Sequence, residues 1–146
     1  MAKDIYLASI PDEFWRIVEA ARQDPDRMTE LLKKEKPSRK ELKHLSWTFE
    51  ALANELREGV YTEYTAPELS EDGIFEVAHW VVAQGKEFYE KVWEDPSKMP
   101  RTKKHDPGLW AAIENEYEER FGAGVPLKEK DWDVDWRKHG KKSPWD

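Results

Sequence analysis

Two Glu-x-x-His pairs are the residues of this sequence whose types and spacing come nearest to metal chemistry. They are Glu41 with His44 and Glu76 with His79. In di-iron helical bundles, pairs of this spacing project inward from two helices and share metal ions with further glutamates. Here the apolar residues around each pair define the buried face of the helix and turn both histidines toward solvent. We therefore predict no metal site and no cofactor.

Three aspartates near the C-terminus, Asp131, Asp133 and Asp135, match the first, third and fifth positions of a calcium-binding loop. Such a loop also needs glycine at its sixth position and glutamate at its twelfth, where this chain has tryptophan and lysine. The calcium interpretation therefore fails. Alternation with a period of two instead predicts an extended tail over 123–146. Its tryptophans would pack on the rest of the chain or bind a partner: Trp132, Trp136 and Trp145.

Nucleophilic catalysis has little support in the sequence. Several serines stand where helices are expected to begin, as at Ser9, Ser38 and Ser70, and capping explains them. The sequence contains no G-x-S-x-G elbow, no phosphate-cradling glycine loop and no dinucleotide fingerprint. Catalytic residues stay unassigned, and a non-catalytic role is favoured over an enzyme.

Four residues outside these motifs are candidates for a binding site. Asp72 and Gln84 are the polar residues that solubility explains least, and Trp15 and Trp80 accompany them. One interpretation is structural, with Asp72 as a first-turn helix carboxylate and Gln84 as a cap for backbone loosened by the following glycine. In the other, the two tryptophans stack on a ligand while Asp72 and Gln84 fix its orientation.

Basic residues gather in two clusters, each beside the expected end of a helix. The clusters are Lys33, Lys34, Lys36, Arg39, Lys40 and Lys43, and then Arg101, Lys103, Lys104 and His105. Solvated helix ends explain both of them. If the two clusters meet in space, they could instead hold an anionic partner.

Length and composition indicate one ordered domain. The chain of 146 residues is near the modal size of a single domain, and eight tryptophans and five phenylalanines supply large anchors for a core. The absence of cysteine excludes disulfides, thiolate catalysis and cysteine-based zinc sites.

Charge and hydropathy bear on location and partners. No stretch is apolar enough for a membrane span, and residues 1–6 do not resemble a secretory signal, so we expect a cytoplasmic protein. The net charge of −7 disfavours nucleic acid as a partner, because an acidic surface repels a phosphate backbone.

Apolar spacing and helix-end signals predict about five helices. The first follows a capping box at Ser9 and reaches Gln23, and the second begins at Asp24 and ends before Pro37. The third has the clearest signal, a capping box at Ser38, and it is expected to end at a glycine at position 59. Its apolar stripe consists of Leu42, Leu45, Phe49, Leu52 and Leu56.

The second half of the chain predicts two more helices. Residues 61–69 lack a helical stripe and are expected to form a loop. Ser70 then caps a fourth helix that continues through Gly85, where a close crossing or a kink is expected. The fifth helix begins at Asp106 with Pro107. The fold class is all-α, with a helical domain over 1–122 and the extended tail after it.

Some of these residues also form a recognisable combination. They are Phe14-Trp15, Ser70-Glu71-Asp72-Gly73-x-Phe75, Trp80-x-x-x-Gln84-Gly85-Lys86, Asp95-Pro96 and Tyr117-Glu118-Glu119 before Phe121-Gly122. With them, residues 12–126 resemble the bacterial family catalogued as domain of unknown function 4240. The resemblance implies a small helical fold and no settled activity. The chain departs from the family at the polar segment 61–69 and at Lys86, where family members favour arginine.

Three functions are compatible with these observations. The leading hypothesis is a non-catalytic accessory domain that binds a protein or peptide through aromatic surface, because tryptophan is enriched at binding hot spots. The second is a small-molecule site or enzyme around Asp72 and Gln84. The third is a binder of an anionic partner through the lysine and arginine clusters. The oligomeric state stays open.

Overall fold

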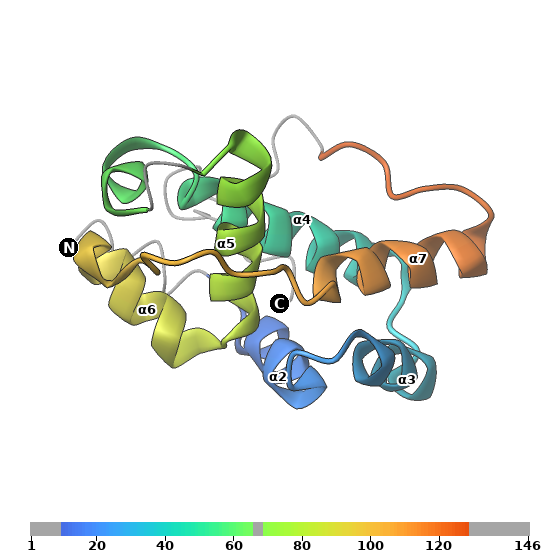
Figure 1. Cartoon of the computed structure of the whole chain (residues 1–146). Coiled ribbons are helices and arrows are strands. Elements are labelled where there is room, and N and C mark those ends of the chain that lie inside the picture. The colour runs from blue at the N-terminus through green and yellow to red at the C-terminus, as the bar shows by residue number, and fades with distance from the viewer. Residues whose placement is uncertain (1–9, 66–68, 129–146) are drawn as a thin grey trace, which may run out of the picture.

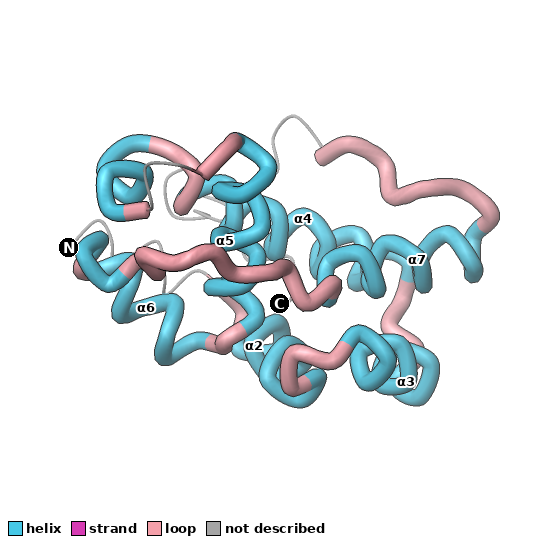
Figure 2. The backbone as a smooth tube through the Cα atoms, viewed as in Figure 1, coloured by secondary structure: helices cyan, strands magenta, loops and turns pink. Residues whose placement is uncertain are grey.

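The computed structural model describes residues 10–65 and 69–128 of the chain (Figure 1). Within these ranges all regular structure is helical, which confirms the predicted all-α class (Figure 2). The elements are α2 (Asp12–Ala21), α3 (Pro25–Glu35), α4 (Arg39–Glu55), the 3-10 helix η1 (Gly59–Tyr64), α5 (Glu71–Ala83), α6 (Lys86–Glu94), the 3-10 helix η2 (Pro96–Lys98) and α7 (Leu109–Phe121).

Helix α4 is the centre of the arrangement, and the other helices pack around it. Helix α5 crosses α4, and α7 lies alongside α4 (Figure 1). Helices α2 and α3 pack on each other below α4, and α3 also packs on α7. The segment 99–108 runs across α5 to reach the start of α7 (Figure 1).

The start of α4 matches its sequence signal closely. Ser38 accepts a hydrogen bond from the Glu41 backbone N–H at 3.1 Å, and the Glu41 carboxylate accepts one from the Ser38 N–H at 2.9 Å. This reciprocal pair is a complete capping box. The predicted apolar stripe is buried along its whole length, so the central position predicted for this helix is correct.

The fourth predicted helix is two helices, because the chain breaks at Gly85. Gly85 has φ 106°, a conformation that side chains rarely adopt, and it caps the start of α6. A Cβ atom there would lie 3.0 Å from Cγ of Glu19. The Glu19 carboxylate in turn accepts a hydrogen bond from the Lys86 backbone N–H at 3.0 Å. The chain therefore turns sharply at Gly85 where a kink was expected, and Glu19 of α2 contacts this turn.

Other predicted boundaries are also wrong for local reasons. The first helix, α2, begins at Asp12 with Pro11 in the N-cap position, so it does not begin with a cap at Ser9. The segment expected to be a loop after α4 contains η1, and the hydroxyl of Tyr61 donates to the Trp93 carbonyl at 2.8 Å, which anchors it to α6. Gly59 begins η1 rather than ending α4, which is capped by Leu56. Helix α7 begins after Gly108, whose N–H donates to the Asp106 carboxylate at 2.8 Å, so Asp106 shapes the turn before the helix.

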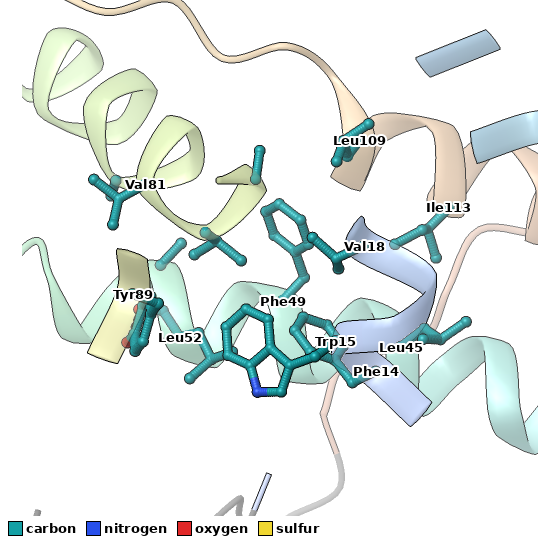
Figure 3. Close-up of a cluster of buried hydrophobic side chains, with 14 of the residues drawn as sticks. Phe14, Trp15, Val18, Leu45, Phe49, Leu52, Val81, Tyr89, Leu109 and Ile113 are labelled. Atoms are coloured by element: carbon teal, nitrogen blue, oxygen red, sulfur yellow. Dashed lines mark hydrogen bonds between the residues drawn. The ribbon is translucent and has the colours of Figure 1, made fainter. Parts of the chain in front are cut away.

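The core is built from large side chains of α2, α4, α5, α6 and α7. Phe14 packs edge-on against Trp15 and Phe49, with ring centroids 5.0 and 6.2 Å away. Figure 3 shows Trp15 among Phe14, Tyr89 and Leu52, and its exposed fraction is 4%. The Tyr89 hydroxyl donates to the Leu52 carbonyl at 2.7 Å, so the core satisfies this polar group internally.

Replacement of Gly85 by alanine should destabilise the fold more than a matched change elsewhere. We expect Gly85→Ala to cost about 1–3 kcal/mol, because it combines a glycine-specific backbone conformation with a clash against Glu19. Gly122→Ala is the control, since Gly122 also has positive φ (73°) but nothing lies within 4 Å of its Cβ position. Urea unfolding measures both. Equal losses for the two variants would contradict a role for the Glu19 contact.

Candidate functional site

A hollow beside the first two turns of α5 is the best candidate for a binding site in the described structure. It has a volume of about 480 Å³, and we name it the α5 hollow. Its lining consists of Leu69, Ser70, Asp72, Gly73, Glu76 and Lys103. Carboxylates, an ammonium group and an apolar wall therefore meet in one depression at the surface.

The start of α5 explains how these side chains are placed. Ser70 accepts a hydrogen bond from the Gly73 N–H at 3.2 Å and caps the helix, as its sequence predicted. Asp72 and Glu76 are four residues apart, so they project from one side of α5. Gly73 packs closely on Leu69, because an added Cβ would lie 3.1 Å from that side chain. The capping serine is thus structural, while the carboxylates remain available.

The charges around the hollow are only partly paired. Asp72 is exposed and forms no hydrogen bond or ion pair with any described residue. Glu76 lies 3.7 Å from Nδ1 of His105, a contact that carries charge only when this histidine is protonated. Lys103 comes from the segment that crosses α5 and adds one positive charge at the rim. The hollow can therefore accept a cationic group beside its two carboxylates.

Gln84, the second polar residue of the predicted site, lies at the opposite end of α5 from Asp72. Twelve residues of helical rise separate the two by about 18 Å. The Gln84 amide donates to the Gln23 side chain at 2.8 Å and to the Trp80 carbonyl at 3.1 Å. It accepts from the Gln23 amide at 3.0 Å. The structure does not bring Asp72 and Gln84 together, and Gln84 ties the end of α5 to the end of α2.

The two candidate tryptophans have different environments. Trp15 is a core residue, with its ring 5.7 Å from that of Tyr89. Trp80 is half-buried, packs edge-on against Phe88, and carries the Lys104 ammonium 4.9 Å from its ring centroid. The Lys104 contact covers the indole in the way a ligand would. Neither tryptophan lines the α5 hollow.

Both histidines of the Glu-x-x-His pairs are buried, so the prediction that they face solvent is wrong. His44 is 6% exposed and packs against Trp47, and His79 is 1% exposed and stacks on Phe75 with ring centroids 3.9 Å apart. Trp110 of α7 covers the face of α5 that the apolar stripe had assigned to solvent. In the described ranges, no three histidine, aspartate or glutamate side chains are placed to hold a metal ion.

A polar cluster between α4 and α7 was not anticipated from the sequence. The Ser46 hydroxyl donates to the Glu114 carboxylate at 2.6 Å and accepts from Trp110 Nε1 at 3.1 Å. The pKa of Glu114 is raised, mainly by burial and also by the nearby Glu50 charge. The hydrogen bond from Ser46 acts in the opposite direction but does not cancel this shift. The two partners are 68 residues apart, so no local spacing connects them. The cluster cross-links two helices.

His79 is a second polar residue buried in this region. Its Nδ1 lies 3.0 Å from the Phe75 carbonyl, which can only accept, so Nδ1 carries the proton. Nε2 then has no hydrogen-bond partner in the described structure. Burial lowers the pKa of His79 and the Arg57 charge acts in the same direction, whereas the Phe75 carbonyl and Asp106 oppose them. The ring is thus held neutral.

The two basic clusters do not meet in space. Arg39 of the first contacts Tyr117 and Phe121 at the end of α7, whereas the second precedes the start of that helix. Thirteen residues of helix separate the two ends by about 20 Å. The anionic partner expected if both clusters acted together is not supported, and each cluster stands by itself.

The predicted tail lies mostly outside the described residues, including Trp132, Trp136 and Trp145. Its first residues are described, and Val125 and Pro126 contact the helical domain, whereas Leu127 is exposed. Trp47 Nε1 donates to the Pro126 carbonyl at 2.9 Å, and Val125 packs against the core. The tail therefore begins along α4.

Comparison with known proteins gives one match. A family model described as a protein of unknown function, DUF4240, matches residues 11–121. No curated protein and no solved structure matches the chain. Each helix in the described part of the chain is too short or too polar to traverse a lipid bilayer.

Mild acid should destabilise the protein before its carboxylates titrate. Burial, with the Lys40 and Lys43 charges, lowers the pKa of His44 from 6.5 to about 4, and burial also lowers the pKa of His79. Below pH 6.5 the unfolded chain therefore binds more protons than the folded one, so stability is kept above 6.5 and lost as the pH falls toward 4.

Calorimetry from about pH 7 to pH 5 should show the melting temperature falling by several degrees. His44→Gln removes one of the two buried titrating groups and should reduce this slope. A wild-type melting temperature that stays constant over the same interval would contradict the burial of neutral histidines.

Proposed function

The chain belongs to the family described as a protein of unknown function, DUF4240, and from its geometry we propose a non-catalytic domain that binds a protein or peptide partner. The α5 hollow supports this proposal. We propose that the hollow receives a basic side chain of the partner, in a cytoplasmic setting that the composition favours.

The Asp72 carboxylate, which has no ion-pair partner among the described residues, is the observation that carries the proposal. It stands at the rim of the hollow beside Glu76, and Leu69 provides an apolar wall. A lysine or arginine side chain matches this combination, since its aliphatic stem packs on apolar surface while its charged head meets a carboxylate. The net charge of −7 also favours the approach of a basic partner.

The expected binding is modest in strength. Exposed ion pairs contribute about 0.2–1 kcal/mol each, so two carboxylates confer selectivity for a cation more than high affinity. Lys103 at the rim further selects a partner with an acidic or polar residue next to its basic one. A small-molecule or catalytic role has less support, because Gln84 is engaged with Gln23 and Trp80 far from Asp72.

Asp72→Asn should remove the preference for a central cation in a set of short peptides. The probes are fluorescent pentapeptides that differ only in a central arginine, norleucine or glutamate, measured by fluorescence anisotropy. We expect the arginine peptide to bind best to the wild type, and Asp72→Asn to weaken it about three- to fivefold. NMR shift perturbations should map to Ser70–Glu76.

A matched control is available in α3. Asp26 is the second residue of its helix and exposed, as Asp72 is in α5, so Asp26→Asn changes net charge and helix-end electrostatics equally. Arginine-peptide binding should survive in this control. Equal binding of the arginine and norleucine peptides to the wild type, or shifts that map elsewhere, would rule out the α5 hollow as a site for basic side chains.

A further inference from the structure

Two arginines lie against one aromatic ring where α7 ends beside the start of α4. The guanidinium carbon of Arg39 is 5.1 Å from the centroid of Phe121, and that of Arg120 is 5.0 Å from the same centroid. The two guanidinium groups are therefore no more than about twice that distance apart. Two positive charges therefore lie beside the same aromatic ring on a protein that is acidic overall.

Each guanidinium is held in place by a hydrogen bond that leaves other donors unused. Arg39 Nε donates to the Tyr117 hydroxyl at 2.8 Å, and Arg120 Nη1 donates to the Pro37 carbonyl at 2.6 Å. Both terminal nitrogens of Arg39 and Nη2 of Arg120 form no hydrogen bond with any described residue. Because these hydrogen bonds already restrict the two side chains, binding of a ligand costs less conformational entropy.

Lysines extend the positive surface along the first turns of α4. Lys40 and Lys43 are one turn apart, and Arg39 and Lys43 are also neighbours on the helix surface. Lys40 forms no ion pair with any described residue, and Lys43 lies 5.6 Å over the Trp47 ring. Burial is the main cause that lowers the pKa of the neighbouring His44, and the Lys40 and Lys43 charges lower it further.

The carboxylates nearest this surface are mostly engaged elsewhere. Glu41 projects from a different side of α4 and closes the capping box with Ser38. Glu119 is bound to Lys33 at 3.1 Å. Glu118 is exposed in the last turn of α7 and offsets part of the charge. In addition, Arg39 and Lys40 occupy the first turn of α4, where the macrodipole disfavours cations and favours an anion.

We infer that Arg39, Arg120 and Lys40 form a binding site for a phosphate monoester. A planar guanidinium binds phosphate oxygens through paired N–H donors, and the charge of Arg39, Arg120 and Lys40 exceeds what one carboxylate would neutralise. A single-stranded nucleic acid fits less well, because Phe121 already carries two guanidinium groups within about 5 Å of its ring centroid and is less open to stacking by a base. This site is separate from the α5 hollow and does not depend on it.

The test is an NMR titration of the full chain with two phosphate sources at constant ionic strength. One probe is inorganic phosphate, and the other is a neutral tripeptide with a central phosphoserine. The unphosphorylated tripeptide and sodium chloride serve as controls. We expect saturable shifts in Ser38–Lys43 and Glu118–Gly122 with both phosphate probes, and the tighter of the two identifies the natural source as free or peptide-borne phosphate.

Substitutions separate recognition from general charge effects. Arg39→Lys keeps the charge but loses the paired donors, so phosphate binding should weaken about tenfold. Lys40→Gln alters an exposed residue that has no ion-pair partner in residues 10–65 and 69–128, so it tests the site even if Arg39→Lys disturbs folding, and we expect about threefold weaker binding. Lys98→Gln, in η2, should leave binding within about twofold of the wild type.

Two results would overturn the inference. One is the absence of a saturable shift with either phosphate probe in the low-millimolar range. The other is equal weakening by Lys40→Gln and Lys98→Gln, because this would mean that phosphate responds to overall charge rather than to a built site. The peptide preference of Asp72→Asn is measured separately, so failure of one proposal leaves the other intact.

Discussion

The burial of α4 on several sides is the constraint on which the rest of the structure depends. Besides its apolar stripe, this helix buries His44, Ser46, Trp47 and Thr48. A polar group buried without a partner costs about 1–3 kcal/mol, so the partners that Ser46 and Trp47 receive stabilise the fold, whereas the Thr48 hydroxyl has no partner among the described residues. Helix α7 supplies the Glu114 carboxylate to Ser46 and the Trp110 indole to the same residue. The segment after α7 supplies the Pro126 carbonyl to Trp47. The position of α7, and the direction in which the chain leaves it, follow from these polar requirements.

Features that depend on neighbouring residues were predictable, and features that depend on distant partners were not. The caps at Ser38 and Ser70 require only a serine and the backbone three residues later, and both are correct. Burial of His79 depends on α7, because Trp110, which is not a sequence neighbour of His79, packs against it. The sequence predicts a close crossing or a kink at Gly85, but it does not predict that Glu19 of α2 contacts the chain there. At the candidate site Asp72 was identified from its type and position, and Glu76 lies one helical turn further along α5, whereas Lys103 joins them only through the path of the segment that crosses α5.

The two proposed binding surfaces lie at the first turns of two helices and carry opposite charge. At α5 the acidic residues agree with the helix macrodipole, so the carboxylates of the hollow are stabilised where they stand. At α4 the basic residues oppose the macrodipole, and contacts with Tyr117 and Phe121 offset that cost for Arg39. Because the protein is strongly acidic overall, a compact cationic surface of this kind requires such local support. The two surfaces are therefore suited to ligands of opposite charge.

The residues that make the family recognisable have structural duties in this chain. Gln84 joins α5 to α2 through Gln23, Gly85 permits the corner into α6, and Lys86 offers the N–H that Glu19 accepts. Trp15 fills the core beside Tyr89. A sequence pattern made of such residues specifies a helical architecture, and an architecture can carry unrelated functions. The functional differences within such a fold are then expected outside the pattern, at Glu76 and Lys103 of the hollow and at the arginines around Phe121.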